Sequence, residues 1–355
     1  MVRIVYVITG LQKGGAEMQL VKLLKYWPRK QEILVIAFRP GPLENELRKM
    51  GISTMIFPIF SMTNALTAMK KTLQVLTDYR PNIVHSWLTH ANILMKFLRI
   101  VKNFKLVTSI RVKEKRYLSH VFLERILDPF ANCVVVNSVV VKEYLCSCLF
   151  DKNKIEVVPN IVELKPIKRK HYDRLKKKYR GKKVVLTVAN FREQKDYRTN
   201  VQVCEKVMKK HQNVVFLYAG DGTERSKIQE IVKKKGLQDK ICFLGTRSDI
   251  PELLEICDVF FLPTLYEGQS NALLEAYTHG CKIVSTNIPE NLELGITATF
   301  CRKGDSDAMA KEILRLIRGR TNGNEEYQAK MKKHQAKRVG KIYMEIYSRI
   351  LQCVG

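Results

Sequence analysis

The sequence contains an apolar run, a polar turn and a helical pattern in direct succession: Val259-Phe260-Phe261-Leu262-Pro263, then Tyr266-Glu267-Gly268-Gln269-Ser270-Asn271-Ala272-Leu273-Leu274-Glu275-Ala276. The run Val259–Leu262 is typical of a buried strand, and Pro263 ends it. Gly268 marks a turn, and Ser270 is a favourable N-cap for a helix that begins at the next residue and ends at Gly280. A strand, a loop and a helix in this order indicate an α/β fold.

Two carboxylates, Glu267 and Glu275, lie eight positions apart in this stretch. Glu267 is predicted in the loop above the strand end, and Glu275 about one and a half turns into the helix, roughly 7 Å along its axis. The two side chains could therefore bind different parts of one extended ligand. Between them, the N–H groups at the helix start, around Ser270 and Asn271, form a candidate anion site.

This strand, loop and helix resemble the donor site of the retaining glycosyltransferases of family 4. That family has the GT-B fold, an α/β architecture of two Rossmann-like, doubly wound parallel-sheet domains that face each other across a cleft. The resemblance implies that Glu267 holds hydroxyls of the donor sugar and Glu275 those of the ribose, both as ionised acceptors. It also implies that the turn between them binds the donor, through Gly268, Gln269, Ser270 and Asn271.

Length and composition indicate two globular domains. The chain has 355 residues, of which 46% are hydrophobic, enough for two domains of about 170 residues each. No run of 18 or more apolar residues appears, and no signal-peptide pattern follows Met1, so we expect a cytoplasmic protein that does not span a membrane. Nine cysteines without a Cys-x-x-Cys pair indicate reduced thiols rather than zinc or redox ligands.

The formal net charge of +28 is the most unusual bulk property. Residues 165–183 hold eleven Lys or Arg against the single acid Asp173, and residues 102–116 and 330–341 are also basic. A charge of this size favours an anionic partner. An anionic membrane leaflet, nucleic acid and a merely solvated surface all remain possible. We expect peripheral binding to the inner face of a membrane.

A glycine-rich turn follows the first predicted strand, residues 3–8. It reads Thr9-Gly10-Leu11-Gln12-Lys13-Gly14-Gly15-Ala16-Glu17, which is neither a P-loop nor a GxGxxG motif. The Gly-Gly-Ala-Glu string is similar to the first loop of the same glycosyltransferase family. That resemblance implies that Gly14 and Gly15 let the backbone approach the donor pyrophosphate or the acceptor, although a plain tight turn would also use them.

Strands then alternate with helices, which predicts a parallel, doubly wound sheet. The predicted strands are residues 33–38, 54–58, 82–85, 105–110, 133–136 and 155–158. Sites of such sheets lie at the carboxyl ends of strands, which places His85, His90 and Arg111 on the rim of one crevice. His85 and Arg111 are candidate acceptor-side residues, although a histidine there is as well explained by a structural hydrogen bond.

The segment Val157-Val158-Pro159-Asn160-Ile161 resembles the family's interdomain segment. We therefore predict an acceptor-side domain of residues 1–162 and a nucleotide-sugar-binding domain of residues 163–339. A final helix, about residues 340–355, has an apolar stripe, and in the GT-B fold such a helix packs back on the first domain. The second domain has predicted strands at residues 183–189, 214–219, 241–244, 258–262 and 282–286.

The loop after the first strand of the second domain reads Asn190-Phe191-Arg192-Glu193-Gln194-Lys195-Asp196. It resembles the family's Arg/Lys pair facing the donor diphosphate, with Asn190 at the usual arginine position. The resemblance implies that Arg192 and Lys195 have this role, with Glu267 the third catalytic candidate, although a solvated basic loop is an alternative for the pair. Two further family signatures are residues 219–222 and 244–249, and the second implies that Arg247 lines the base pocket.

No essential metal or other cofactor is expected. Asp305 and Asp307 precede an amphipathic helical pattern, which makes them capping and helix-dipole residues rather than metal ligands. Asp221 alone is not a convergent carboxylate pair.

These patterns favour a retaining glycosyltransferase that moves a sugar from a nucleoside diphosphate sugar to a hydroxyl of a lipid-linked glycan acceptor. A nucleotide-sugar 2-epimerase shares the GT-B fold and is one alternative. An inactive glycosyltransferase-like binding protein is another, because Asn190, Arg111 and Ile161 depart from the family pattern. A nucleic-acid-binding protein would explain the charge, but the basic stretches lack interleaved aromatics and recognition motifs, so no nucleic-acid partner is expected.

Overall fold

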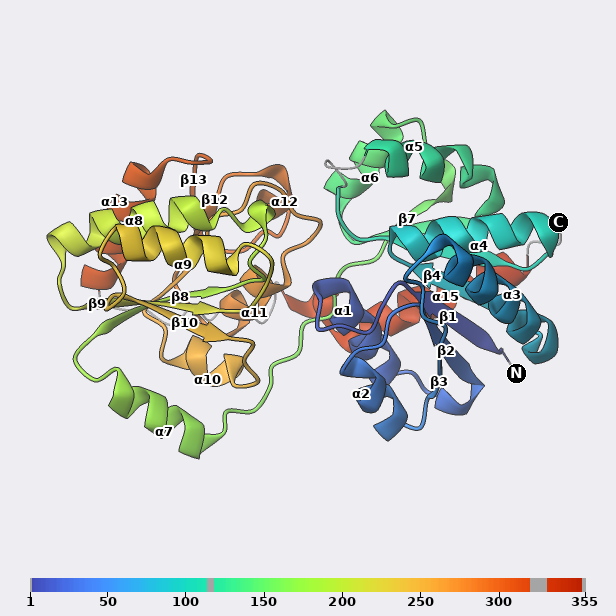
Figure 1. Ribbon diagram of the computed structural model, residues 1–355, viewed down its shortest axis with the longest axis horizontal. Helices are drawn as coiled ribbons and strands as arrows, with labels where there is room; N and C mark the ends of the chain where they lie inside the picture. The colour runs from blue at the N-terminus through green and yellow to red at the C-terminus, as the bar shows by residue number, and fades with distance from the viewer. Residues whose placement is uncertain (1, 114–117, 320–330, 353–355) are drawn as a thin grey trace. The chain divides into compact units, whose positions relative to one another are not determined.

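The computed structural model describes residues 2–113, 118–319 and 331–352 (Figure 1). The chain divides into two compact α/β units. The first comprises Met1–Ile161 with Lys333–Gly355, and the second comprises Val162–Lys332. The chain passes from the first unit to the second after Ile161, one residue before the predicted boundary. It returns to the first unit after Lys332, seven residues earlier than predicted.

The first unit contains a seven-stranded parallel sheet in the order β3-β2-β1-β4-β5-β6-β7. Its strands are β1 Ile4–Ile8, β2 Ile33–Ala37, β3 Ser53–Ile56, β4 Ile83–Trp87, β5 Leu106–Ile110, β6 Cys133–Val136 and β7 Ile155–Val157. The order reverses between β1 and β4, as in doubly wound sheets. The predicted strand series is confirmed.

Helices cover both faces of this sheet (Figure 1). They are α1 Gly15–Lys25, α2 Leu43–Lys49, α3 Met62–Tyr79, α4 Thr89–Val101, α5 Leu118–Ile126, α6 Val139–Ser147 and α15 Ala336–Gln352, with short turns η1 Lys30–Glu32, η2 Asp128–Phe130, η3 Lys152–Lys154 and η5 Lys332–His334. Alternate residues of β1 reach opposite faces: Tyr6 packs with α1, α2 and α15, whereas Val5 and Val7 pack with α3 and α4.

The second unit contains a six-stranded parallel sheet in the order β10-β9-β8-β11-β12-β13. Its strands are β8 Lys183–Val188, β9 Val214–Ala219, β10 Ile241–Gly245, β11 Val259–Leu262, β12 Ile283–Thr286 and β13 Thr299–Cys301. Five of these were predicted. The edge strand β13 was missed because three residues are too few to give a strand pattern.

Helices also cover both faces of the second sheet. They are α7 Arg169–Lys178, α8 Tyr197–Lys210, α9 Arg225–Lys234, α10 Ile250–Glu255, α11 Asn271–Thr278, α12 Pro289–Leu292 and α13 Ser306–Arg318, with the turn η4 Glu193–Lys195. Helices α8, α9 and α13 share a core on one face, and α7, α10 and α11 share a core on the other. The predicted capping role of Asp305 is confirmed, because its carboxylate accepts from the N–H of Ala308 at 2.9 Å.

Helix α15 belongs to the core of the first unit. Its side chains Val339, Tyr343, Ile346, Tyr347 and Ile350 are buried against the face of the sheet that also carries α1. Among the residues that the structure describes, no helix is long and apolar enough to cross a membrane. Of the predicted basic stretches, residues 114–116 and Lys330 lie outside the described residues.

Candidate active site

Two loops of the second unit meet at the carboxyl ends of neighbouring strands. Because β8 pairs with β11, the loop that ends in η4 lies beside the loop that leads to α11. The N–H of Leu265 donates to the carbonyl oxygen of Gln194 at 2.9 Å, and Nε2 of Gln194 donates back to the carbonyl oxygen of Tyr266 at 2.6 Å. These bonds fix the two loops relative to each other.

Lys195 and Glu267 form an ion pair where these loops meet. Both side chains are largely withdrawn from solvent, with exposures of 17% for Lys195 and 7% for Glu267. The hydroxyl of Thr264 donates to Oε1 of Glu267 at 3.1 Å, and Nε2 of Gln194 lies 3.3 Å from its Oε2. Two of the predicted catalytic residues are therefore brought together, and the carboxylate is held in one orientation.

Helix α11 begins directly after this carboxylate. Ser270 is its N-cap, in extended conformation, with its hydroxyl accepting from the N–H of Leu273 at 3.5 Å, so the predicted cap is confirmed. Gly268 is buried in the turn, and Glu275 is half-buried in the second turn of the helix. The positive end of the helix dipole therefore lies beside the Lys195–Glu267 pair and favours an anionic group there.

A third loop, between β9 and α9, packs against the loop that follows β8. Gly220 and Gly222, with φ of 143° and 158°, lie so close to residues 189–191 that side chains would not fit. A Cβ on Gly220 would lie 2.0 Å from the carbonyl oxygen of Ala189. The N–H of Phe191 donates to the carbonyl oxygen of Asp221 at 3.0 Å. These two glycines let the backbone hold the loop that carries Arg192 and Lys195.

The two arginines predicted to bind the donor have different environments. Arg192 is the extended N-cap of η4, and its side chain is exposed at the end of β8. Arg247 is engaged with Asp249 through two hydrogen bonds of 2.7 and 2.5 Å. Burial opposes ionisation of Asp249, but the bonds from Arg247 outweigh it and lower the pKa of that carboxyl. Arg192 is thus available for a ligand, while Arg247 is held in place by its carboxylate partner.

Two family models match the chain in succession. The model described as Glycosyltransferase Family 4 matches residues 13–165, and the model described as Glycosyl transferases group 1 matches residues 168–338. The chain belongs to the family 4 glycosyltransferases. It is an enzyme of the GT-B type, and the two matches coincide closely with its two α/β units.

Relatives of this glycosyltransferase align over most of its length. The Staphylococcus aureus capsular polysaccharide biosynthesis glycosyltransferase CapH is 24% identical over 308 residues, which is 83% of this chain and 84% of that protein. The Campylobacter jejuni GalNAc-alpha-(1→4)-GalNAc-alpha-(1→3)-diNAcBac-PP-undecaprenol alpha-1,4-N-acetyl-D-galactosaminyltransferase is 25% identical over 299 residues, 81% of this chain and 80% of that one. Anabaena HepE, solved in complex with UDP and glucose, shares the fold with a TM-score of 0.87 at 19% identity, covering 98% of this chain and 100% of that chain.

The glycosyltransferase does not carry His85 at the rim of its first sheet, and that prediction is wrong. Strand β4 continues to Trp87, so His85 lies within the sheet and is fully buried. Its Nδ1 lies 2.6 Å from the hydroxyl of Tyr347, and its Nε2 lies 2.9 Å from that of Ser109. The error arose because the strand was predicted to end at His85, whereas it continues for two more residues.

Arg111 follows β5, as predicted, but it is only 8% exposed rather than open at a rim. Its guanidinium donates to Oδ1 of Asn160 at 2.5 Å and to the hydroxyl of Tyr343 at 3.4 Å, and it lies 4.7 Å from the ring centroid of Trp87. Arg111 therefore fastens the segment that leaves the first unit to α15 and the sheet. These contacts join parts of the first unit and stabilise its fold.

The predicted donor-contacting glycines of the first unit lie at a helix start. Gly14 is the N-cap of α1, with φ of −97°, and Gly15 is its first residue. A Cβ on Gly14 would meet only the flexible carboxylate of Glu17. The plain-turn alternative is therefore weakened, because this backbone conformation does not require glycine.

Gln194 and Thr264 were not predicted as site residues. Both hold Glu267, and each lies just beyond a strand, Gln194 after β8 and Thr264 after β11. The available signal was the strand order, because a doubly wound sheet places its first strand beside its fourth. Polar residues that follow those two strands are expected to meet.

No metal site accompanies this arrangement in the part of the chain that the structure describes, where no three His, Cys, Asp or Glu side chains cluster closely enough to hold an ion. Asp221 instead pairs with Arg225 at 2.8 Å. The absence of an essential metal stays a prediction. The eight cysteines within the described residues are free thiols.

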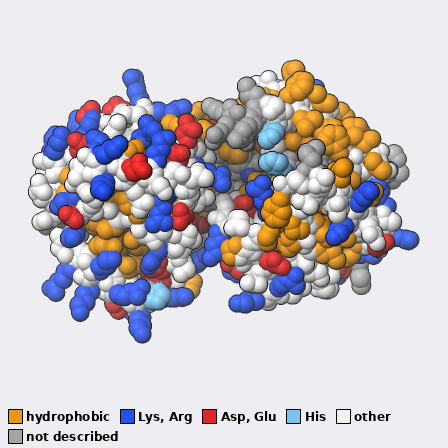
Figure 2. All heavy atoms as spheres, in the orientation of Figure 1, with side chains coloured by type: hydrophobic (Ala, Val, Ile, Leu, Met, Phe, Trp, Pro, Cys, Tyr) orange, Lys and Arg blue, Asp and Glu red, His pale blue; other side chains and the backbone are white. Residues whose placement is uncertain are grey.

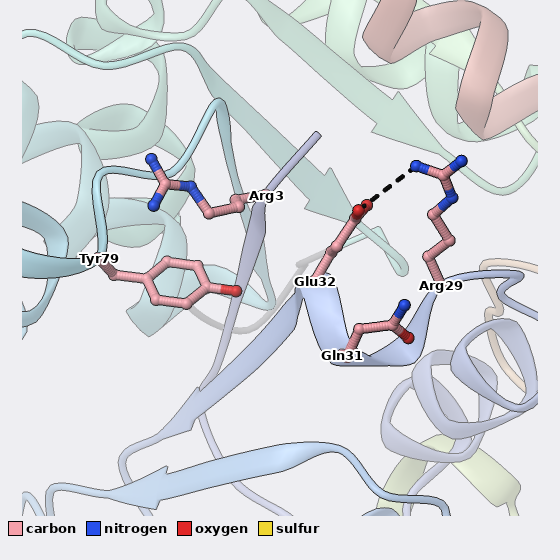
Figure 3. Close-up of a pocket in the computed structure, with 5 residues that line it drawn as sticks. All are labelled: Arg3, Arg29, Gln31, Glu32 and Tyr79. Atoms are coloured by element: carbon pink, nitrogen blue, oxygen red, sulfur yellow. Dashed lines mark hydrogen bonds and ion pairs between the residues drawn. The ribbon is translucent and has the colours of Figure 1, made fainter. Parts of the chain in front are cut away.

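One cavity of the first unit has a volume of about 670 Å³ and is lined by Arg3, Arg29, Gln31, Glu32 and Tyr79. Figure 3 shows the Arg29–Glu32 pair on one side of it and Arg3 with Tyr79 on the other. These residues lie at the amino ends of β1, β2 and β4, opposite to the edge where sites of parallel sheets form. The cavity therefore does not lie where sites of such sheets are found.

Proposed function

We propose that this enzyme transfers a sugar, with retention of anomeric configuration, from a nucleoside diphosphate sugar to a hydroxyl of a lipid-linked glycan intermediate in cell-surface polysaccharide assembly. The observation that carries the proposal is the buried Glu267, held by Lys195, Gln194 and Thr264 beside the start of α11. Support for a nucleotide-sugar donor comes from HepE, which was solved with UDP and glucose. Support for a lipid-linked acceptor comes from the Campylobacter relative, whose name includes a PP-undecaprenol glycan.

The difficult step in such a reaction is charge separation. As the bond between the anomeric carbon and the diphosphate oxygen breaks, negative charge grows on the diphosphate. Lys195, Arg192 and the N-terminus of α11 would stabilise that charge, because fixed donors and cations act most strongly where charge develops. Glu267 would accept hydrogen bonds from hydroxyls of the sugar, and Glu275 from those of the ribose. The acceptor oxygen bonds to the anomeric carbon on the same face, and its proton passes to the departing diphosphate.

A panel of nucleoside diphosphate sugars tests this function. We expect one donor to release its nucleoside diphosphate slowly in water and faster when a polyprenyl diphosphate glycan is added, with the new linkage in the donor's configuration by NMR. A donor sugar that changes configuration at its second carbon without acceptor would support the epimerase instead. Absence of turnover with every donor and acceptor would favour the inactive binding protein.

A further inference from the structure

The first unit exposes large apolar side chains on two adjacent helices. On α4, Phe97, Ile100 and Val101 are 39%, 55% and 73% exposed, and on α5, Phe122 and Ile126 are 67% and 52% exposed. We call these five residues the α4–α5 face. Figure 2 shows hydrophobic side chains gathered over this part of the first unit. Several large apolar side chains exposed on two helices that pack against each other are typical of an interaction site.

The apolar residues of this face are additional to those that build the core. Helix α4 buries Ala91, Met95 and Leu98 against the sheet, so its exposed residues lie on its other side. Helix α5 reverses the usual pattern of a surface helix: it directs Phe122 to solvent and buries Glu124. Packing within the unit therefore does not account for the exposed residues.

A buried ion pair holds α5 in this orientation. Nζ of Lys96 lies 2.8 Å from Oε2 of Glu124, with side-chain exposures of 0% and 4%. The same ammonium donates to the carbonyl oxygen of Glu124 at 2.9 Å, and Nδ2 of Asn92 donates to its Oε1 at 3.1 Å. Rotation of α5 to bury Phe122 would leave two charges unpaired in the interior, which is costly. The outward position of Phe122 and Ile126 is thus fixed.

The surroundings of the face are basic. Among the described residues 89–113 and 118–126, the single acid is Glu124, which is buried in its pair with Lys96. The half-buried bases on or next to α4 and α5 are Lys102, Lys105, Lys113 and Arg125, besides Arg99, whose guanidinium donates inward to Phe104 and Asn132. Apolar side chains on two helices that carry bases and no exposed acid of their own complement an anionic lipid surface. A second copy of this chain would bring the same basic surround and a net charge of +28, which opposes self-association.

We propose that the α4–α5 face inserts into the headgroup region of an anionic lipid bilayer. Phe122, Ile126 and Val101 enter the apolar boundary, and the neighbouring Lys and Arg side chains face lipid phosphates. The α4–α5 face would bring the enzyme to a lipid-linked acceptor. This role of the face rests on the proposed function. The basic helix α7 offers charge alone, because its one buried apolar residue, Leu175, packs inward.

Co-sedimentation of the full chain with vesicles tests the face. The double variant Phe122→Ser with Ile126→Ser removes apolar side chains that are 67% and 52% exposed, and its matched control, Leu66→Ser with Leu292→Ser, removes side chains that are 61% and 50% exposed elsewhere. On phosphatidylglycerol-containing vesicles at physiological salt we expect the face variant to lose about tenfold in partitioning, and the control less than about twofold. Equal losses in the two variants, or no binding by the unaltered chain, would overturn the proposal.

Two further measurements sharpen the result. Phe122→Trp should show a blue-shifted emission with anionic vesicles and quenching by brominated lipid, against a background of two tryptophans that are 8% and 1% exposed. Unchanged emission in a vesicle-bound protein would assign binding to charge alone, as α7 could supply, and would overturn insertion. Partitioning onto neutral phosphatidylcholine equal to that onto anionic vesicles would overturn the lipid specificity.

Failure of this proposal can be distinguished from failure of the proposed function. Release of nucleoside diphosphate in vesicle-free solution reports the transferase chemistry alone, and the double face variant should retain it together with an unchanged melting temperature. Face-dependent vesicle binding without any donor turnover would support the docking face and count against the transfer reaction. Donor turnover without vesicle binding would support the transfer reaction and count against the docking face.

Discussion

Nδ1 of His85 lies 2.6 Å from the hydroxyl of Tyr347, a residue 262 positions later in the chain. The contact joins strand β4 to helix α15 inside the first unit. Burial, together with the positive charge of Arg111, holds the pKa of His85 well below its ordinary value, so the imidazole is neutral. A neutral ring suits its hydrogen bonds to Tyr347 and Ser109.

Stability should therefore fall as the pH is lowered from about 6.5 to 4. Burial likewise lowers the pKa of His334, to about 4, while its Nδ1 lies 2.7 Å from the carbonyl oxygen of Asn160. A histidine whose folded pKa is depressed binds its proton more readily when unfolded, so acid favours unfolding. We expect His334 to contribute a loss of about 2 kcal/mol between pH 7.5 and 5, and His85 to act in the same direction.

Urea unfolding at these two pH values measures the effect. His334→Gln cannot take up this proton, so its stability should depend less steeply on pH than that of the unaltered chain. Identical pH dependence in the two proteins would contradict the assignment to His334.

Lys195→Ala should lower turnover by about a hundredfold, because in the proposed mechanism the ammonium stabilises the diphosphate charge that develops in the transition state. Initial rates of nucleoside diphosphate release at saturating donor measure it. Lys183→Ala is a matched control on the amino side of the same strand β8, where Lys183 pairs with Asp258 at 2.8 Å and has a 43% exposed side chain. The control should keep turnover within about twofold, since exposed pairs contribute little. Equal rates in both variants would remove Lys195 from the site.

Glu275→Gln should weaken donor binding about tenfold, because in the proposed donor complex a neutral amide replaces a carboxylate that accepts charge-assisted hydrogen bonds from the ribose. Calorimetric titration with the donor found by the panel measures the dissociation constant. Glu312→Gln is the control, since Glu312 pairs with Arg315 at 2.7 Å on the surface of α13. Donor affinity that is unchanged by Glu275→Gln would place the ribose elsewhere.

Much of the architecture was predictable because strand and helix patterns are local. The apolar run of β11, the cap at Ser270 and the end of α11 before Gly280 follow from neighbours in sequence, and the structure confirms each. The contact between Lys195 and Glu267 was harder to predict from the sequence. Both residues were singled out, but their contact depends on β8 lying beside β11, which is a property of sheet order rather than of either loop.

His85 and Arg111 show where local reasoning fails. Both were predicted to be at the sheet rim from their positions near strand ends, and neither pattern contains information about α15, which covers them from more than 200 residues away. The same limit applies to α5. Its sequence contains Phe122, Glu124 and Ile126, and only the buried partner Lys96 determines which of them faces solvent.

Gly220→Ala should abolish most of the activity, although Gly220 is not one of the residues proposed to bind the donor. The added Cβ would lie 2.0 Å from the carbonyl oxygen of Ala189, and a φ of 143° is strained for any L side chain. The backbone must shift, and the shift passes to the loop that carries Arg192 and Lys195. We expect a loss of about 3 kcal/mol in the free energy of unfolding and the disappearance of most donor turnover.

Gly236→Ala provides the control for this glycine substitution. Gly236 also has a positive φ, 65°, but nothing lies within 4 Å of its added Cβ, and it follows α9 away from the catalytic loops. This variant should lose only about 1 kcal/mol, from backbone conformation alone, and should keep its turnover. Urea unfolding and initial rates measured on both variants separate strain from contact. If Gly220→Ala behaves like Gly236→Ala, close approach of the two loops is not what positions Lys195.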